Sequence, residues 1–339
     1  MPDYKRDEAR EWAREHLTGC SAVTSPTFTA NLRRLNEDAI RHDVKRVMEH
    51  GFSYTLLMAE TAITPDEVGR FTAIAREAAG GRLRLFAHTA FGTLADNIEA
   101  LRHAEREGAD LVLLSYPPQF WPTSEQQIYD WTKSICDATS LGAMLFPIPL
   151  WGFERVHPAG MSVEFVRHVL DTIPNIVAIK SEQGFPGIAG LCEMYRHFRD
   201  EVVISCPIES DAIPLMSVMD LQFSGTSNTH WMSDWYPTTF ELARTGRWDD
   251  AMERFWQVQP ARLAAGAAAQ SYAGGTGVLN RTHWKYQEWL AGYNGGPLRA
   301  PAMRIPDRIM KLLRTGLEAS GLPVTDDPDS EFMIGRNPG

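Results

Sequence analysis

The 339-residue sequence has few cysteines, and none of them stands in a spacing that builds a covalent or metal framework. Its four cysteines, Cys20, Cys136, Cys192 and Cys206, are far apart, and no CxxC pair occurs. A disulfide scaffold is built in a small domain dense in cysteines, and a zinc cage takes its cysteines in closely spaced pairs. We therefore expect reduced thiols in a hydrophobic core.

Long apolar runs, a basic excess and glycine-rich phosphate loops are also absent. No run of about 18 apolar residues occurs and the first residues are charged, which predicts a soluble cytoplasmic protein with no membrane partner. Asp and Glu number 43 against 33 Lys and Arg, so no electrostatic feature supports nucleic-acid binding. The absence of GxGxxG and GxxxxGK[ST] motifs argues against an open, doubly wound sheet.

What is present is an alternation of short apolar runs with longer amphipathic segments, typical of strand-helix units around a parallel sheet. Eight runs are strand candidates: Ala22–Phe28, Tyr54–Ala59, Leu83–His88, Leu111–Tyr116, Ala143–Pro147, Ile176–Lys180, Val202–Cys206 and Leu221–Thr226. Several are almost wholly apolar, as strands buried on both faces should be. The pattern predicts an α/β fold, a (β/α)8 TIM barrel.

Capping residues define the starts of the intervening helices. Asn36 precedes an amphipathic segment that ends before Gly51. Thr64-Pro65-Asp66-Glu67 places an N-cap before a proline at the first helical position, and Thr123-Ser124-Glu125 begins a later helix in a similar way.

The chain divides into four segments on this pattern. Residues 1–20 form an N-terminal helix, residues 21–247 the barrel, residues 248–322 a helical extension and residues 323–339 a loosely ordered tail. The extension is expected to hold three helices, over Asp249–Ala269, Thr282–Leu290 and Pro306–Ala319.

Lys180 is the strongest candidate for chemistry because it ends the apolar run Ile176–Lys180. Catalytic groups of TIM barrels lie at the C-terminal ends of the strands. A lysine buried there favours its neutral form, and a neutral amine attacks carbonyl groups. The alternative is a lysine that extends to solvent from the strand end.

Several segments occur in an order that resembles the dihydrodipicolinate synthase/N-acetylneuraminate lyase family of class I aldolases. Pro174 to Gly184 is similar to that family's Schiff-base signature. The supporting pieces are Glu60 before the Thr64 helix start, Tyr116-Pro117-Pro118, Pro149 and Gly225-Thr226-Ser227-Asn228.

The resemblance implies that Lys180 attacks the C2 carbonyl of pyruvate or another 2-keto acid. The chain would then be a lyase, an aldolase or a hydratase-aldolase, that uses no metal or other cofactor. The resemblance also implies a homotetramer built as a dimer of dimers.

Three positions depart from the family pattern. Phe146 stands where the family has a proton-relaying tyrosine. Leu57 to Thr61 lacks the glycines of the family's carboxylate-binding loop and leaves only the Thr61 hydroxyl. Leu150-Trp151-Gly152 stands where the synthases have an arginine for a dicarboxylic substrate. We therefore do not expect a true dihydrodipicolinate synthase.

Proton transfer must then come from another side chain. Glu60 and Glu182 rank first as catalytic partners of Lys180, ahead of His88, Tyr116 and Glu209. The expected substrate-binding residues are Phe146, Thr61, Tyr116, Trp121, Trp151, Thr226 and Asn228.

Aromatic residues gather in the predicted loops at the C-terminal ends of the strands. They are Phe91, Phe120, Trp121, Phe146, Trp151, Phe153 and Trp231. Such residues at a barrel mouth favour an aromatic or apolar aldehyde as the second substrate. The alternative is that they pack against the helical extension or a subunit interface.

Two other functions are consistent with the sequence. A metal-dependent enzyme would use Glu60, His88, Glu209 and His230, which all end or follow strands, although no HxH or HExxH spacing occurs. A non-catalytic barrel that binds a small acid would explain the loss of the tyrosine.

Overall fold

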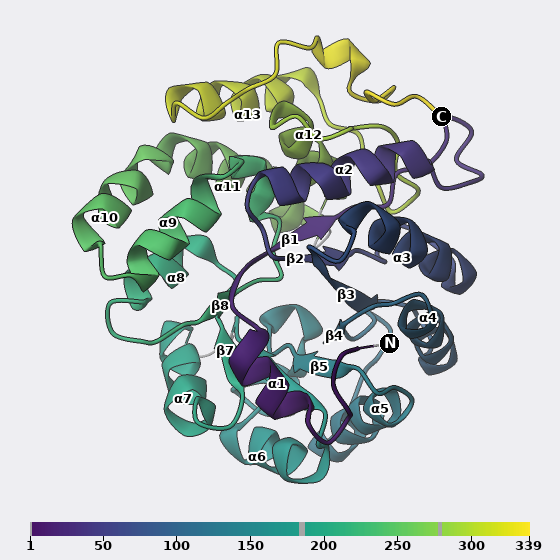
Figure 1. Ribbon diagram of the computed structural model, residues 1–339, viewed down its shortest axis with the longest axis vertical. Coiled ribbons are helices and arrows are strands. Elements are labelled where there is room, and N and C mark those ends of the chain that lie inside the picture. Colours follow the sequence, from purple (N-terminus) through teal and green to yellow (C-terminus); the bar gives the residue numbers. More distant parts are fainter. Residues whose placement is uncertain (1, 183–186, 277–279) are drawn as a thin grey trace.

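The computed structural model describes residues 2–182, 187–276 and 280–339, so Gln183 and Gly184 of the family signature lie outside it. Within these residues, eight parallel strands close into a barrel in the order of the sequence (Figure 1). They are β1 Gly19–Thr24, β2 Tyr54–Leu57, β3 Arg84–Thr89, β4 Leu111–Leu114, β5 Gly142–Leu145, β6 Ile176–Lys180, β7 Val203–Ser205 and β8 Phe223–Ser224. The predicted TIM barrel is confirmed.

One helix follows each strand and covers the outside of the barrel. These helices are α2 Glu37–Glu49, α3 Pro65–Ala79, α4 Leu94–Arg106, α5 Glu125–Asp137, α6 Val163–Thr172, α7 Ile188–Phe198, α8 Glu209–Leu215 and α9 Trp235–Arg244. Asn36, Thr64 and Ser124 each accept a hydrogen bond from the first turn of their helix, as predicted, and Thr64 forms a capping box with Glu67.

The first strand begins three residues earlier than predicted and ends at Thr24 rather than Phe28. Ser25 and Pro26 end the strand because proline cannot donate a ladder hydrogen bond. Gly19 starts the strand at a φ of 88°, a conformation that glycine adopts without strain.

Helix α1, Ala9–His16, closes the N-terminal end of the barrel. Its buried Trp12 and Ala13 belong to the same apolar cluster as the interior side chains Tyr54, Phe86 and Phe223. These three rings pack against one another at centroid distances of 5.3–6.1 Å. The barrel is therefore filled from its N-terminal end, which leaves the C-terminal end for a site.

The C-terminal extension contains four helices in the described part of the chain, not three. They are α10 Trp248–Gln257, α11 Gln259–Thr276, α12 Arg281–Leu290 and α13 Asp307–Ala319. The predicted helix over Asp249–Ala269 breaks at Val258, because Pro260 lacks an N–H and would collide with the carbonyl four residues earlier. Helix α13 packs against α11 and α12, and α12 and α13 lie on the same side of the barrel as α2 (Figure 1).

The tail was expected to be a loosely ordered arm, and this expectation is wrong. Phe332 is buried, and its carbonyl accepts a hydrogen bond of 2.7 Å from Gly296 N. Asn337 donates to Asn294 Oδ1 over 2.8 Å, and Asn36 Nδ2 donates to the Asn337 carbonyl over 2.7 Å. The tail thus joins the extension to the start of α2.

Within the described residues, no helix combines the length and apolar character needed to cross a membrane.

Candidate active site

Lys180 ends β6 inside the mouth of the barrel, where it is 5 % exposed. Its Nζ donates a hydrogen bond of 2.8 Å to the Thr226 carbonyl, which follows β8. The same nitrogen lies 3.5 Å from Glu182 Oε1 and 3.7 Å from the centroid of the Phe146 ring. The lysine does not extend to solvent.

The burial of Lys180 alters its protonation. Desolvation lowers the pKa of Lys180 below its ordinary value, and the nearby carboxylates of Glu182 and Glu60 only partly oppose this effect. A lowered pKa increases the fraction of neutral amine at pH 7. The neutral amine is the form that attacks a carbonyl carbon.

Glu60 follows β2 and is paired with an arginine from the C-terminal extension. Arg281, at the start of α12, donates from Nε to Glu60 Oε2 over 2.6 Å and also pairs with this oxygen through Nη2. Burial is the largest single influence and raises the pKa of Glu60, but Arg281, with smaller contributions from His88 and Lys180, outweighs it and leaves the pKa below its usual value. Glu60 is therefore held as a carboxylate.

His88 is the last residue but one of β3, lies beside this ion pair and is neutral near pH 7. Burial lowers its pKa to about 4, although the charge of Glu60 acts in the opposite direction. Its Nδ1 accepts a hydrogen bond of 3.3 Å from Ala59 N, so Nε2 carries the hydrogen and donates to Ser115 Oγ over 2.8 Å. Both ring nitrogens thus have protein partners.

A cavity of about 150 Å³ lies above Lys180. Its walls contain six of the residues predicted from the sequence: Lys180, Glu60, Glu182, Phe146, Trp151 and Thr226. The rest of the wall is largely apolar and includes Val23, Leu56, Met58, Leu113, Ile148, Leu150 and Trp284, with His88, Ser227 and Arg281. The structure therefore brings the two predicted carboxylates and the lysine into one cavity.

Four predicted binding residues lie outside this wall. Tyr116 is buried and its hydroxyl bonds to Thr132 Oγ1 over 2.6 Å on the outer side of the barrel. Thr61 is buried, and Trp121 is 70 % exposed with Arg155 stacked on its ring. Asn228 lines a neighbouring cavity of about 280 Å³, which also contains Glu209.

Some of the predicted aromatic residues line the cavity, and others lie outside it. Trp151 lines the cavity and donates from Nε1 to the Phe146 carbonyl over 2.6 Å. Phe120 and Phe153 instead pack with Tyr116 at centroid distances of 5.9 Å and 5.0 Å. These two rings therefore pack on another residue of the barrel rather than line the cavity, and their contacts with Tyr116 involve neither the helical extension nor a second subunit.

Arg281 and Trp284 line the cavity but were not identified from the sequence. Both lie on α12, about 100 residues after Lys180, and the Arg281 guanidinium carbon lies 3.8 Å from the centroid of the Trp284 ring. From sequence alone, a charged residue near the start of a helix is ordinarily assigned to the face of the helix that contacts solvent. Nothing local in the sequence separates Arg281 from such a residue.

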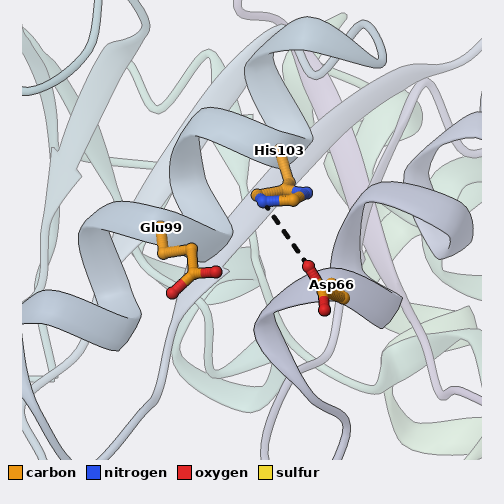
Figure 2. Close-up of side chains that lie close together, drawn as sticks. All are labelled: Asp66, Glu99 and His103. Carbon is orange, nitrogen blue, oxygen red and sulfur yellow. Dashed lines mark ion pairs between the residues drawn. The ribbon is translucent and has the colours of Figure 1, made fainter.

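The four residues considered for a metal site do not form a group within the described residues. Glu209 pairs with Arg262 at 2.8 Å, and His230 Nε2 lies 3.1 Å from Glu288 Oε1. The described residues that could hold an ion together are Asp66, Glu99 and His103, on the outer surfaces of α3 and α4 (Figure 2). His103 Nε2 lies 3.7 Å from Asp66 Oδ1, away from the barrel mouth.

Comparison with known families places this geometry in context. The model of the dihydrodipicolinate synthetase family matches residues 60–255, which is more than half of the chain. The chain belongs to this family. Membership supports a Schiff-base lyase or aldolase kind of function, and the matched range includes Lys180, Glu60 and Glu182.

Individual relatives are distant. A DapA-like lyase of Pyrobaculum arsenaticum is 29% identical over 50% of this chain and 54% of its own length. A 4-hydroxy-tetrahydrodipicolinate synthase of Desulforamulus reducens is 28% identical over 51% of this chain and 57% of its own. The chain thus spans about half the length of these relatives. A synthase of Clostridium perfringens is 23% identical over 89% of this chain and 98% of its own.

Solved structures share the fold. Dihydrodipicolinate synthase from Aquifex aeolicus has a TM-score of 0.75 at 18% identity and covers 91% of this chain and all of its own. A prophage protein of the same family from E. coli K12, crystallised with pyruvate, has a TM-score of 0.73 at 17% identity, covering 91% and 99%.

Proposed function

We propose that this protein forms a Schiff base between Lys180 and pyruvate or another 2-keto acid, and joins or cleaves a carbon-carbon bond with an aromatic or apolar aldehyde. The observation that carries the proposal is the buried Nζ of Lys180, which lies 3.5 Å from a carboxylate in the wall of a cavity at the barrel mouth. Family membership supports the same kind of chemistry.

The first step is imine formation. The neutral amine of Lys180 adds to the C2 carbonyl, and a proton moves from nitrogen to oxygen to give a carbinolamine. Glu182, next to Nζ, takes a proton from the Lys180 ammonium before this addition and afterwards returns it to the carbinolamine hydroxyl, which leaves as water and leaves the iminium. The resulting iminium withdraws electrons from C3, so that a C3–C4 bond can form or break.

Proton transfer in the later step falls to a carboxylate because Phe146 has no hydroxyl. Glu182 is the better placed of the two candidates, since Glu60 already pairs with Arg281. His88 is a weaker candidate because its ring nitrogens are engaged with Ala59 and Ser115.

The apolar wall supports the choice of aldehyde. Phe146, Trp151 and Trp284 contribute rings to the cavity, and Trp151 meets Phe146 edge to face at a centroid distance of 5.5 Å. An apolar pocket favours an apolar or aromatic ligand over a polyhydroxylated one. We accordingly propose an activity other than dihydrodipicolinate synthesis, in a cytoplasmic homotetramer. Light scattering at micromolar protein checks the assembly, and a monomer would contradict it.

Borohydride reduction tests the proposal. The protein is incubated with pyruvate and borohydride, and its mass is measured before and after. We expect one covalent adduct, of the mass of pyruvate less one water plus two hydrogens. Chelator-sensitive turnover without an adduct would favour the metal-dependent alternative, and pyruvate binding without adduct or turnover would favour the binding protein.

A further inference from the structure

Two polar groups in the wall of the cavity have no hydrogen-bond partner among the described residues. They are Arg281 Nη1 and Thr226 Oγ1, and both are shielded from solvent. Arg281 as a whole is 7 % exposed and Thr226 is 2 % exposed. A buried donor without a partner costs free energy, and charged donors cost most. A ligand in this cavity can supply the missing acceptor.

Arg281 is held rigidly for such a task. Its Nε and Nη2 are engaged by Glu60 Oε2, and its guanidinium plane lies over the Trp284 ring at 3.8 Å. Glu60 holds the edge of the guanidinium, and the Trp284 ring covers its face. Because an arginine offers five N–H donors in a fixed fork, the Nη1 group remains available for a planar anion.

The cavity wall contains two carboxylates, Glu60 and Glu182, and two cations once Lys180 has become an iminium, the other being Arg281. A ligand carboxylate is therefore held by direct contact with Arg281 rather than by an excess of positive charge. The segment after β2 offers no glycine-rich backbone for a carboxylate, since it reads Leu57-Met58-Ala59-Glu60-Thr61. The Thr61 hydroxyl lies outside the cavity wall.

We infer that Arg281 binds the carboxylate of the 2-keto acid through Nη1, with the Thr226 hydroxyl as a second donor. This inference rests on the proposed function. It places the cation that binds the substrate carboxylate in the C-terminal extension rather than in a loop of the barrel. The keto acid would lie between Lys180 on β6 and Arg281 on α12, with its carboxylate toward the helix. Glu60 then acts as a positioning residue for the arginine.

The test compares pyruvate with pyruvamide, a neutral compound of nearly the same shape. Adduct formation with borohydride is measured against the concentration of each compound, for the unchanged chain and for Arg281→Met. The unchanged chain should reach half-maximal trapping at a much lower concentration of pyruvate than of pyruvamide. In Arg281→Met the pyruvate value should rise on the order of 10- to 100-fold, as expected for loss of a charged hydrogen bond, while the pyruvamide value stays within about threefold.

Two further variants separate charge recognition from damage to the fold. Arg281→Lys keeps a cation and should retain part of the preference for pyruvate. Arg299→Met is the matched control, because Arg299 also pairs with a glutamate, Glu67, and covers a ring, Phe28, but lies outside the cavity. It should trap both compounds as the unchanged chain does.

The outcomes are distinct. An unchanged preference for pyruvate in Arg281→Met would overturn the role of Arg281 and leave the Schiff base intact. A loss of trapping that is equal for pyruvate and pyruvamide would also overturn it, because only the carboxylate differs between them. Absence of any adduct in the unchanged chain would overturn the proposed function and this inference with it.

Discussion

The Nζ atom of Lys180 lies 3.7 Å from the centroid of the Phe146 ring, on the adjacent strand end. The ring covers one side of the amine and excludes water from it, which contributes to the desolvation that lowers the pKa of Lys180. It offers no proton donor. Phe146 therefore favours the neutral, nucleophilic form of Lys180. Because it cannot transfer protons itself, that role falls to the carboxylates of the cavity.

Lys180→Ala should abolish turnover and adduct formation together, because the attacking nitrogen is lost. Lys180→Arg should do the same, since a guanidinium does not form an imine. Lys285 serves as the internal control: it is also buried, but its Nζ donates to Thr27 Oγ1 over 2.6 Å and it lies outside the cavity wall. Peptide mapping should find the adduct on Lys180, and an adduct on Lys285 would contradict the assignment.

Glu182→Gln should lower kcat by ~10²–10⁴-fold, the usual effect of removing a general acid-base group. The adduct should still form on long incubation, because the amine and its cavity remain. Glu60→Gln should act differently, mainly by raising KM for the keto acid, because it releases Arg281 from its fixed position. Steady-state kinetics of the two variants provide the comparison. Equal effects on kcat alone would show that the roles assigned to the two glutamates are wrong.

Trp151→Ala should weaken the use of aromatic aldehydes, by about tenfold in kcat/KM, because an edge-to-face partner of Phe146 and a wall of the cavity are removed. Trapping of pyruvate should change little. Trp121→Ala is the matched control, since Trp121 is 70 % exposed and lies outside the cavity. In the unchanged chain, aromatic aldehydes should be used better than aspartate semialdehyde or N-acetylmannosamine. The reverse order would refute the proposed partner.

His88 should make the protein sensitive to acid. Its folded-state pKa is about 4, against about 6.5 when unfolded, so the unfolded chain binds more protons between these values. Stability from this residue is complete above pH 6.5 and is lost as the pH falls toward 4. Between pH 7 and pH 5 the loss amounts to about 2 kcal/mol in the free energy of unfolding.

Urea unfolding at the two pH values measures this effect in the unchanged chain and in His88→Gln. The variant should lose less stability on acidification, by roughly the same 2 kcal/mol. Carboxylates also titrate in this pH range, but they contribute equally to both chains. Subtracting the stability loss of His88→Gln from that of the unchanged chain therefore leaves the contribution of His88. Identical losses in both would show that His88 is not buried in its neutral form.

The barrel could be predicted from the sequence because its strands are continuous apolar runs and its helices begin at capping residues. Asn36, Thr64 and Ser124 signal their helices through local backbone hydrogen bonds, which neighbouring residues alone determine. Lys180 was identifiable for a related reason, since a charge at the end of a buried strand has few structural explanations.

The rest of the cavity depends on contacts between distant segments. Arg281 meets Glu60 across 221 positions of sequence, and nothing within α12 indicates that pairing. Tyr116 and Trp151 both follow strands, yet the direction of each side chain is set by its packing partner, Thr132 for one and Phe146 for the other. The tail packs through Phe332 and Asn337 on Gly296 and Asn294, which a composition rich in Asp and Pro does not reveal.

A crystal structure of the protein soaked with pyruvate tests the central claim most directly. The account predicts continuous electron density from Lys180 Nζ to C2 of the bound acid within the cavity beneath Trp151, with Glu182 beside the new bond. Pyruvate bound in the cavity without a covalent link to Lys180, or bound elsewhere while the amine stays on the Thr226 carbonyl, would contradict the Schiff-base assignment.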